Sequence, residues 1–343
     1  MLDSADIFAA SLSRREGEWI FFRGGRKISE CSIGKERAAD SAEEYMAAMD
    51  RRPLPMEQCL YQAEVIPLSG GGVFLYVRFH HVIIDGYGMS LFAQKVLDVL
   101  AGKKMERSAF FSENIAVPEA VSGRSAEGEE VNERDRQENG FWRSYFNGAE
   151  FENAVFPQKT DGNKFGSCRV SVPEKLMREA EEFGGRENIS IPYIFAAAYA
   201  LYLAQATGKK DAVFLMPRLN RIYGQMDTLG CYTLLVPVRV QIEGTDTFTE
   251  LCRKIKAASR EASVHKGCGF DRILAILRDE NMIGESLSEY VFNFYRFSFC
   301  ADFRYSVRFS VAGEMSNHLT FNLFCNEKDG LDLQADYQES IYT

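Results

Sequence analysis

Several features that mark common protein classes are scarce or missing in this 343-residue chain. It has only 4 histidines, and none of its 8 cysteines form a Cys-x-x-Cys pair; Cys268, which follows His265 by three residues, is the one cysteine at a zinc-like distance from a histidine. We therefore expect no metal centre, and thiols that stay reduced in the cytoplasm. No apolar run reaches the length of about 18 residues that a membrane-spanning helix needs. The first residues lack the basic and apolar regions of a signal peptide, so the expected location is cytoplasmic, away from the membrane.

Positive charge is also in short supply. The chain has 40 Lys and Arg residues against 49 Asp and Glu residues, which gives a formal net charge of -9. An acidic surface repels phosphate backbones, so nucleic acid is not an expected partner. The composition is 46% hydrophobic, enough for sizeable cores, and the length predicts about two domains at roughly 100–200 residues each.

The first half of the sequence predicts helices and strands in irregular alternation. Residues 7–15 are interpreted as the end of a helix, which a strand follows at residues 19–22. The predicted elements after these are a helix at 41–50, strands at 60–67 and 73–79, and a helix with apolar spacing at 89–100. Both faces of the strand at 73–79 are largely apolar, which predicts a strand covered on both sides. Residues 122–139 are the most polar stretch and mark a boundary between two halves.

The second half predicts further elements of both kinds. Helices are expected at 173–183, at 191–206 with a stop at Gly208, and at 247–264 behind a capping box formed by Thr247 and Glu250. Strands are expected at 167–172, 212–216, 232–241, 290–299, 303–311 and 318–325, with one more after a turn at 326–330. This mixture favours an α/β or α+β pair of domains.

One short segment carries candidate chemistry. His80 and His81 follow the covered strand directly, and Asp85-Gly86 comes four residues after His81. Histidine suits proton transfer near neutral pH because its free pKa is about 6.5. Asp85 need not touch the histidines, since it can instead fix the loop by pairing with a cation elsewhere, and Gly86 permits a backbone geometry or close approach that a side chain would block. The alternative is a pair of structural histidines before an ordinary Asp-Gly turn.

The segment His80-His81-Val82-Ile83-Ile84-Asp85-Gly86 resembles the His-His-x-x-x-Asp-Gly signature of condensation domains of nonribosomal peptide synthetases, which belong to the chloramphenicol-acetyltransferase-like superfamily. Further segments resemble other parts of the family in the same order. They lie at residues 141–143, 217–221, 229–239, 265–271 and 291–295. The resemblance covers residues from about 5 to 340.

The resemblance implies a fold and a function. The fold is α/β, with two acetyltransferase-like lobes in a V-shape, each a mixed sheet with helices, and an active-site tunnel between them. The lobes would be residues 1–150, which carry the motif, and 151–343. The reaction would join a carrier-bound acyl thioester to an amine, with peptidyl or acyl carrier domains and small acyl and amine molecules as partners. No cofactor would bind directly; the phosphopantetheine arm would arrive on the carrier.

The resemblance also implies roles for single residues. Within the catalytic segment, His81 would face the reaction centre next to His80, while Asp85 and Gly86 would hold the loop. Arg221 would pair with Asp85 across the lobes, and Asn293 would face the tunnel and contact substrate. The alternatives are a solvated loop arginine at 221 and an amide satisfied by the backbone at 293. We interpret His265 as a helix-end residue and His318 as a packing or surface residue.

The sequence departs from the family at three positions. The usual Ser two residues after the motif glycine is Gly88, an expected Asn aligns with Leu234, and the Pro before Phe270 is Gly269. Compared with the family, the chain also starts near the end of the first helix and stops before the closing helices, so we expect a domain shortened at both ends. Two other functions therefore remain open: a degenerate domain that binds carriers or other proteins without catalysis, and a stand-alone acyltransferase that acts on a soluble amine or alcohol.

Overall fold

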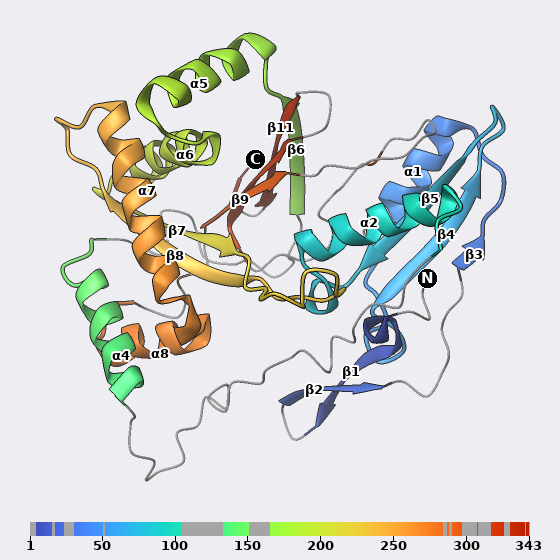
Figure 1. Cartoon of the computed structure of the whole chain (residues 1–343), viewed down its shortest axis with the longest axis horizontal. Helices are drawn as coiled ribbons and strands as arrows, with labels where there is room; N and C mark the ends of the chain where they lie inside the picture. The colour runs from blue at the N-terminus through green and yellow to red at the C-terminus, as the bar shows by residue number, and fades with distance from the viewer. Residues whose placement is uncertain are drawn as a thin grey trace. The chain divides into compact units, whose positions relative to one another are not determined.

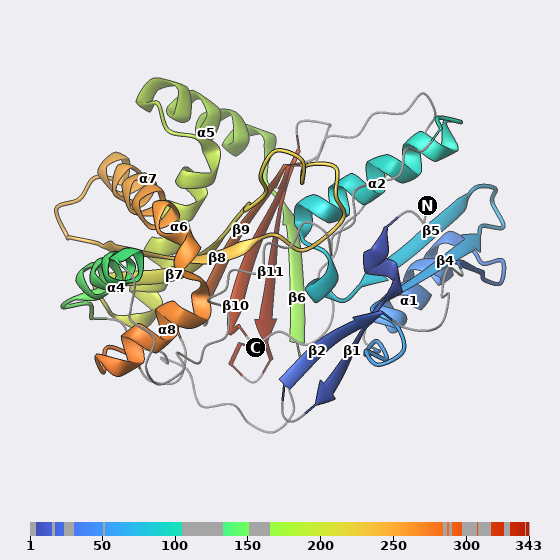
Figure 2. The ribbon, with the colours of Figure 1, turned by 60° about the horizontal axis from the view of Figure 1, so that its bottom comes forward.

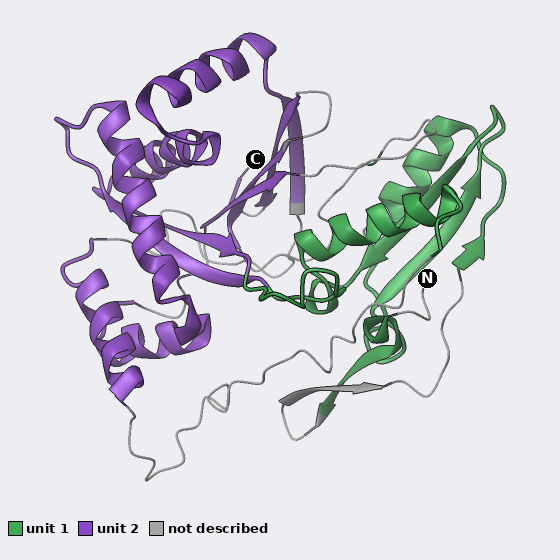
Figure 3. Cartoon of the chain, viewed as in Figure 1, with its two compact units in different colours: residues 1–116, 220–232, 298–313 green, residues 117–219, 233–297, 314–343 purple. Residues whose placement is uncertain are grey.

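The computed structural model describes residues 5–15, 18–23, 31–50, 52–104, 133–150, 165–283, 287, 290–296, 307, 317–325, 330–339, 341 and 342 (Figure 1). The chain forms two compact units, each built from separate stretches of sequence (Figure 3). Unit 1 comprises Met1–Ala116, Asn220–Tyr232 and Ser298–Gly313, and unit 2 comprises Val117–Leu219, Thr233–Phe297 and Glu314–Thr343.

The described part of unit 1 contains two sheets and two α-helices. Its elements are the 3-10 helix η2 (Asp6–Ala9), β1 (Ala10–Arg15), β2 (Glu18–Arg23), β3 (Cys31–Ile33), α1 (Ala39–Asp50), β4 (Tyr61–Pro67), β5 (Val73–Phe79), the 3-10 helix η3 (His81–Ile83) and α2 (Gly86–Leu100). β1 and β2 form an antiparallel pair. In the other sheet, β4 pairs in parallel with β3 and antiparallel with β5, so this sheet is mixed as predicted.

The predicted cover on both faces of β5 is confirmed for its later residues, whereas Val73 and Leu75 near its start are exposed. The cover follows from the alternation of side chains along a strand. On one face Val77 and Phe79 pack in a cluster with Phe92 of α2. On the other face Phe74 and Tyr76 pack with α1. The two helices therefore lie on opposite faces of the β3–β4–β5 sheet (Figure 2).

The prediction of a helix end at residues 7–15 is wrong. After the single 3-10 turn, the chain continues as β1. Ile7 and Phe8 are buried against the sheet, and the Phe8 ring packs at 5.0 Å from that of Tyr61. Burial of these side chains outweighs the weak local preference for helix.

Unit 2 is built around one six-stranded mixed sheet. Its strands are β6 (Phe165–Ser171), β7 (Asp211–Arg218), β8 (Leu234–Gln241), β9 (Tyr290–Arg296), β10 (Leu319–Cys325) and β11 (Leu331–Gln338), in the order β6-β11-β10-β9-β7-β8. β9 runs parallel to both β10 and β7, and the other neighbours are antiparallel. The predicted strand at 303–311 lies outside the described residues, apart from Val307.

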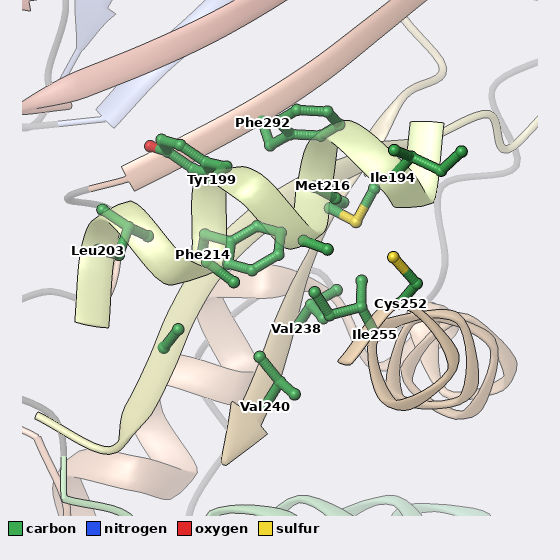
Figure 4. Close-up of a cluster of buried hydrophobic side chains, with 14 of the residues drawn as sticks. Ile194, Tyr199, Leu203, Phe214, Met216, Val238, Val240, Cys252, Ile255 and Phe292 are labelled. Atoms are coloured by element: carbon green, nitrogen blue, oxygen red, sulfur yellow. The ribbon is translucent and has the colours of Figure 1, made fainter. Parts of the chain in front are cut away.

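One face of this sheet packs against three helices: α5 (Glu174–Glu187), α6 (Ile191–Thr207) and α7 (Phe248–Val264) (Figure 2). Tyr199 of α6, Phe214 of β7 and Phe292 of β9 lie at the centre of the buried cluster in Figure 4. The predicted stop of α6 is confirmed, because Gly208 adopts a left-handed φ of 67° at its end. The predicted capping box of α7 is confirmed as well.

The compact units differ from the predicted boundary at residue 150. Helix α4 (Glu133–Phe146) belongs to unit 2, because its fully buried Trp142 and Phe146 pack with α8 (Phe270–Asp279) and with Val236 of β8. Residues 220–232 belong to unit 1 although they connect β7 and β8 of unit 2. The predicted division into 1–150 and 151–343 therefore does not follow the compact units.

Within the described residues, no single helix is long and apolar enough to cross a membrane. The bent pair of α5 and α6, with 106° between the helices, meets the criteria of length and composition together.

Candidate active site

The two histidines of the motif lie where β5 ends in unit 1. The backbone N–H of His80 donates to the carbonyl of Leu60 at 2.7 Å, which continues the pairing of β5 with the start of β4. His81 opens the short helix η3, and the fully buried side chains of Ile83 and Ile84 anchor this turn in the apolar cluster of unit 1. The imidazole of His81 is exposed.

His80 and His81 have different surroundings. The Nδ1 atom of His80 accepts a hydrogen bond from the backbone N–H of Val82 at 3.2 Å, so His80 caps η3. Burial lowers the pKa of His80 below its ordinary value, and the neighbouring charge of His81 lowers it further. His80 is therefore a neutral structural cap near neutral pH, and His81 is the histidine of the pair that can meet a ligand from solvent.

Asp85 organises the loop that follows. It caps α2, with Oδ1 accepting from the backbone N–H of Gly88 at 2.7 Å. Its other oxygen, Oδ2, accepts from the backbone N–H of Tyr232 at 2.8 Å. A buried carboxylate requires such donors and a counter-charge.

Arg221 supplies that counter-charge. Its Nη2 lies 3.2 Å from Oδ1 of Asp85, and both side chains are almost fully buried, with 0% and 1% of their surface exposed. Nη1 donates to the carbonyls of Gln225 and Thr228, at 2.8 and 2.6 Å. The guanidinium also lies over the rings of Tyr87 and Tyr232, at 4.7 and 4.4 Å from their centroids. It is therefore not the solvated loop arginine of the alternative interpretation.

The Asp85–Arg221 pair is formed, but it lies inside one unit. The prediction had placed it across two lobes. Segment 220–232 folds into unit 1, next to the start of α2 (Figure 3), so both partners belong to the same compact unit.

At Gly88 the lack of a side chain has a visible structural reason. Gly86 is the buried first residue of α2 and is not among the residues with positive φ. A Cβ atom added at Gly88 would lie 2.7 Å from Cγ1 of Ile84 and 2.9 Å from the carbonyl oxygen of Gly230. The serine that the family resemblance predicts at this position would press on both Ile84 and the Gly230 carbonyl, so both neighbours would have to shift.

Asn293 lies in unit 2, on β9, and ends a chain of hydrogen bonds across the sheet. Its Nδ2 donates to Oδ1 of Asn322 at 2.7 Å, and Nδ2 of Asn322 donates to Asp336 at 2.6 Å. The other oxygen of Asp336 accepts from Gln334 at 2.8 Å. The Asn293 amide is therefore held by another side chain, not by the backbone as in the alternative interpretation.

The carboxylate of Asp336 determines which group donates and which accepts in this series of hydrogen bonds. A carboxylate only accepts, so Asn322 must turn its NH2 group toward Asp336 and its oxygen toward Asn293. Asn293 must then donate with its own NH2 group, which leaves its Oδ1 as an acceptor. This oxygen is buried and has no hydrogen-bond partner among the described residues. Burial raises the pKa of Asp336 above its ordinary value, although hydrogen bonds from Ser167, Gln334 and Asn322 oppose the shift.

The remaining positions singled out in the sequence have structural explanations. Gly269 has φ 80°, a value that the ring of a proline forbids. Leu234 is the first residue of β8. As interpreted, His265 lies at the end of α7, where it stacks at 3.6 Å on Phe141 and contacts Glu138 at 3.0 Å. His318 is buried, which agrees with a packing role.

Cys231 is a feature of the site that the sequence interpretation missed. Its Sγ lies 4.0 Å from Nδ1 of His81, although 150 residues separate them in sequence. The available signal was its position between Gly230 and Tyr232, in a segment that resembles the family. Among the described residues, no three His, Cys, Asp or Glu side chains converge on a possible metal position.

Comparison with known proteins identifies the class of this fold. The profile of the condensation-domain family, described as "Condensation domain", matches residues 7–343, so the chain belongs to that family. Members of this family are the condensation modules of nonribosomal peptide synthetases and have a chloramphenicol-acetyltransferase-like fold.

Among curated proteins, the chain is similar to the dimodular nonribosomal peptide synthase of Bacillus subtilis (strain 168). The two are 27% identical over 219 residues, which is 62% of this chain and 9% of the relative. The surfactin synthase subunit 1 of the same organism is 24% identical over 216 residues, 59% of this chain and 6% of the relative. The chain thus spans less than a tenth of these relatives' length.

Two solved structures resemble the fold over almost the whole chain. The first condensation domain of the calcium-dependent antibiotic synthetase, in complex with a substrate analogue, has a TM-score of 0.79 at 17% identity; the match covers 100% of this chain and 81% of that one. The protein SgcC5 from Streptomyces globisporus, in complex with an aryl ethanediol and sucrose, has a TM-score of 0.78 at 16% identity, with 99% and 82% covered. At these identities the likeness concerns the fold alone.

Proposed function

We propose that the chain catalyses acyl transfer that forms an amide bond between a carrier-bound acyl thioester and an amine, as in nonribosomal peptide condensation. The observation that carries the proposal is the exposed imidazole of His81 on a loop fixed by the buried Asp85–Arg221 pair. A base for an incoming amine needs access to substrate and a fixed position, and His81 has both.

The proposal divides the work among the site residues. His81 uses Nε2 to position or deprotonate the amine, or to donate a hydrogen bond to the tetrahedral intermediate. His80, Asp85 and Gly86 hold the loop, and Arg221 neutralises Asp85. Asn293 contacts substrate, because its oriented Oδ1 is an acceptor that an amine or amide N–H of the substrate can satisfy. The acyl group would arrive on the phosphopantetheine arm of a peptidyl or acyl carrier, and no metal or other cofactor enters the reaction.

The test is product formation from an acyl-loaded carrier and an amine-loaded carrier, followed by intact-mass measurement. We expect His81→Ala to reduce the rate about 10²–10⁴-fold, the usual contribution of proton-transfer catalysis. Because His81 is exposed, this variant should keep the thermal midpoint of the wild type. Near-normal product formation by His81→Ala would exclude the proposed role.

A soluble acceptor is the second candidate. SgcC5 was solved with a small diol, which favours testing free amines and alcohols beside carrier-bound amines. Product from a free acceptor but none from the loaded carrier would establish a stand-alone acyltransferase. The third possibility, a degenerate domain that only binds partners, is weakened because Asp85 has its cation and the glycines at 88 and 269 fit their backbones. If the chain binds a carrier but forms no product with any acceptor, the degenerate, non-catalytic domain becomes the supported function.

A further inference from the structure

One face of the sheet in unit 2 is polar although its side chains are buried. It is the face opposite α5, α6 and α7 (Figure 2), because Phe292, Leu323 and Leu331 pack toward those helices and successive side chains alternate. The polar residues buried on it, each at most 3% exposed, are Thr320, Asn322, Gln334, Asp336 and Gln338. Buried polar groups are normally hydrogen-bonded, so a group without a partner here indicates a ligand that supplies one.

Two neighbouring oxygens on this face are buried and have no hydrogen-bond partner among the described residues: Oδ1 of Asn293 and Oγ1 of Thr320. In the register of β9 and β10, Asn293 lies beside Asn322, and Thr320 precedes Asn322 by two residues on the same face. Such diagonal neighbours are about 7–8 Å apart, so one polar group of a ligand can lie between them and bond both. Nε2 of Gln338 also lacks a partner, but it is a donor and lies on the far side of Thr320 from Asn293.

The charge of this face indicates which kind of polar group would bind. On β6, β9, β10 and β11 its described charged side chains are Asp332, Asp336 and Arg169. Arg169 bonds Asp332 at 2.9 Å, and Asp336 has no cation in contact among the described residues. Asp336 accepts from Asn322, which in turn accepts from Asn293. Because hydrogen bonds in series polarise one another, the negative charge of Asp336 strengthens Oδ1 of Asn293 as an acceptor.

We propose that Asn293, Thr320 and Asp336 form a site for a side-chain ammonium group, so that the preferred substrate carries a basic amino acid such as lysine. The inference rests on the proposed function, in which Asn293 contacts substrate, and it names the class of that substrate. The ammonium group donates to Oδ1 of Asn293 and to Oγ1 of Thr320, which uses two of its three N–H bonds.

Asp336 supplies the counter-charge, because it lies directly opposite Thr320 on the neighbouring strand. Two opposite charges about 7–8 Å apart, in surroundings with an effective dielectric constant of about 20, attract each other enough to raise affinity about 30-fold. This attraction is absent for a side chain of similar length without charge. The site therefore distinguishes lysine from norleucine, its apolar counterpart.

Binding of probes that cannot react tests the inference without the reaction. Lysyl-aminopantetheine has an amide in place of the thioester, and the norleucyl probe lacks only the ammonium group. Titration calorimetry with the full chain should give a Kd about 30-fold lower for the lysyl probe. The 6-hydroxynorleucyl probe, which bonds without charge, should bind with an intermediate Kd. Equal Kd values for the lysyl and norleucyl probes would overturn the proposal, and so would a lower Kd for the hydroxyl probe than for the lysyl probe.

Thr320→Val is the most informative variant, because it removes the hydroxyl group at nearly constant shape. Since this hydroxyl has no partner, its loss should leave the thermal midpoint unchanged or raise it. Affinity for the lysyl probe should fall about 10-fold, the usual effect of losing a hydrogen bond to a charged group, while affinity for the norleucyl probe stays the same. Thr245→Val, in the exposed turn after β8, is the matched control and should change neither Kd.

Asp336→Asn tests the role of charge. The ratio of the norleucyl Kd to the lysyl Kd should fall from about 30 to below about 5 in this variant. A ratio measured within one variant does not depend on how much of that variant is folded. An unchanged ratio in both Thr320→Val and Asp336→Asn would exclude the site.

Condensation assays separate this inference from the proposed function. Lysine is placed once on the donor thioester and once on the acceptor, each time against norleucine. We expect kcat/KM to be about 30-fold higher for lysine in one of the two positions, which identifies the substrate that this site holds. Product formation that is equally fast with lysine and norleucine in both positions would reject the site and leave the condensation reaction intact. Conversely, selective binding of the lysyl probe without product from any loaded carrier would support the site and reject the carrier-based reaction.

Discussion

The carboxylate of Asp85 and the guanidinium of Arg221, 136 residues apart in sequence, form an ion pair at 3.2 Å from which solvent is almost wholly excluded. Arg221 also bonds three backbone carbonyls and lies over two tyrosine rings, so its removal leaves several acceptors and one buried charge without a partner.

We expect Arg221→Met to lower the free energy of unfolding by about 3–5 kcal/mol, the usual cost of breaking a buried pair from one side. Urea denaturation measures the change. Asp85→Asn combined with Arg221→Met should recover only part of the loss: the uncompensated charge is gone and the asparagine oxygen still caps α2, but its NH2 group then faces the backbone N–H of Tyr232. The surface control is Arg253→Met. Arg253 forms an exposed ion pair with Glu187, and the loss of this pair should lower the free energy of unfolding by less than about 1 kcal/mol. Equal losses for Arg221→Met and Arg253→Met would contradict this account.

Two glycine-to-alanine changes should have opposite effects. Gly88→Ala forces a methyl group against Ile84 and the Gly230 carbonyl, and overpacking of this kind costs about 1–3 kcal/mol. Gly140 lies inside α4 with nothing within 4 Å of an added Cβ. Gly140→Ala should therefore stabilise the protein by about 0.5–1 kcal/mol through its better helix propensity. Thermal midpoints that move in the same direction for both variants would refute the close approach at Gly88.

The lowered pKa of His80 implies that the stability of the fold depends on pH. Its folded-state pKa lies below the unfolded value of about 6.5, so its contribution to stability is present above that value and is lost as the pH falls through the lower folded pKa. His80→Asn keeps an acceptor for the N–H of Val82 and does not titrate, so its stability relative to wild type should improve as the pH falls. Urea unfolding between pH 7 and the folded pKa measures this difference.

A direct readout accompanies that experiment. Titration of the imidazoles followed by NMR should give His80 a pKa below the ordinary histidine value. His81→Ala should raise the pKa of His80 part of the way back, since the charge of His81 is the second cause of the shift. An ordinary pKa for His80 in the wild type would show that it is not a half-buried neutral cap.

Asp336→Asn tests the directed chain that ends at Asn293. The new NH2 group faces a donor, either Asn322 or Gln334, so we expect a loss of about 1–3 kcal/mol in the free energy of unfolding. Because burial raises the pKa of Asp336, its contribution is greatest below the unfolded value of about 3.9 and falls as the pH rises through the folded pKa. The difference in free energy of unfolding between the wild type and Asp336→Asn should therefore become smaller as the pH rises from about 3.9 through the folded-state pKa of Asp336.

The matched control is Asp332→Asn, on the same face of β11, where the carboxylate pairs with Arg169 and Ser171. If Asn293 holds substrate, Asp336→Asn should raise KM for the acceptor more than Asp332→Asn does, with kcat and KM measured separately. The same KM in both variants would show that the hydrogen bonds from Asn293 through Asn322 to Asp336 have a structural role only.

The sequence predicted the elements that have strong periodicity or clear end signals. The apolar pattern at 73–79, the stop at Gly208 and the capping box at Thr247 all correspond to observed features. Short segments were less certain: residues 7–15 form a 3-10 turn and a strand, because contacts with residues of β4 and α2 decide their conformation.

Helix α8 was missed although Ile273, Ile276 and Leu277 have helical spacing. The ion pair at Asp85 followed from the family resemblance, but its place inside one unit did not. Neither the thiol beside His81 nor the direction of the Asn293 amide has a local sequence signal, since each depends on residues far away in the chain. The reason for glycine at position 88 likewise becomes visible only once Gly230 is seen beside it.

Segment 220–232 also sets an order of events in folding. The strands that precede it in unit 1 are made early in synthesis, yet the cation that their loop requires comes 136 residues after Asp85. Closing so long a loop costs entropy that later contacts must offset. The histidine loop therefore takes its final geometry late, after β7 has been synthesised and the connecting segment has returned to α2. A newly made chain that stops short of Arg221 holds every residue of the motif without the arrangement that gives the motif its use.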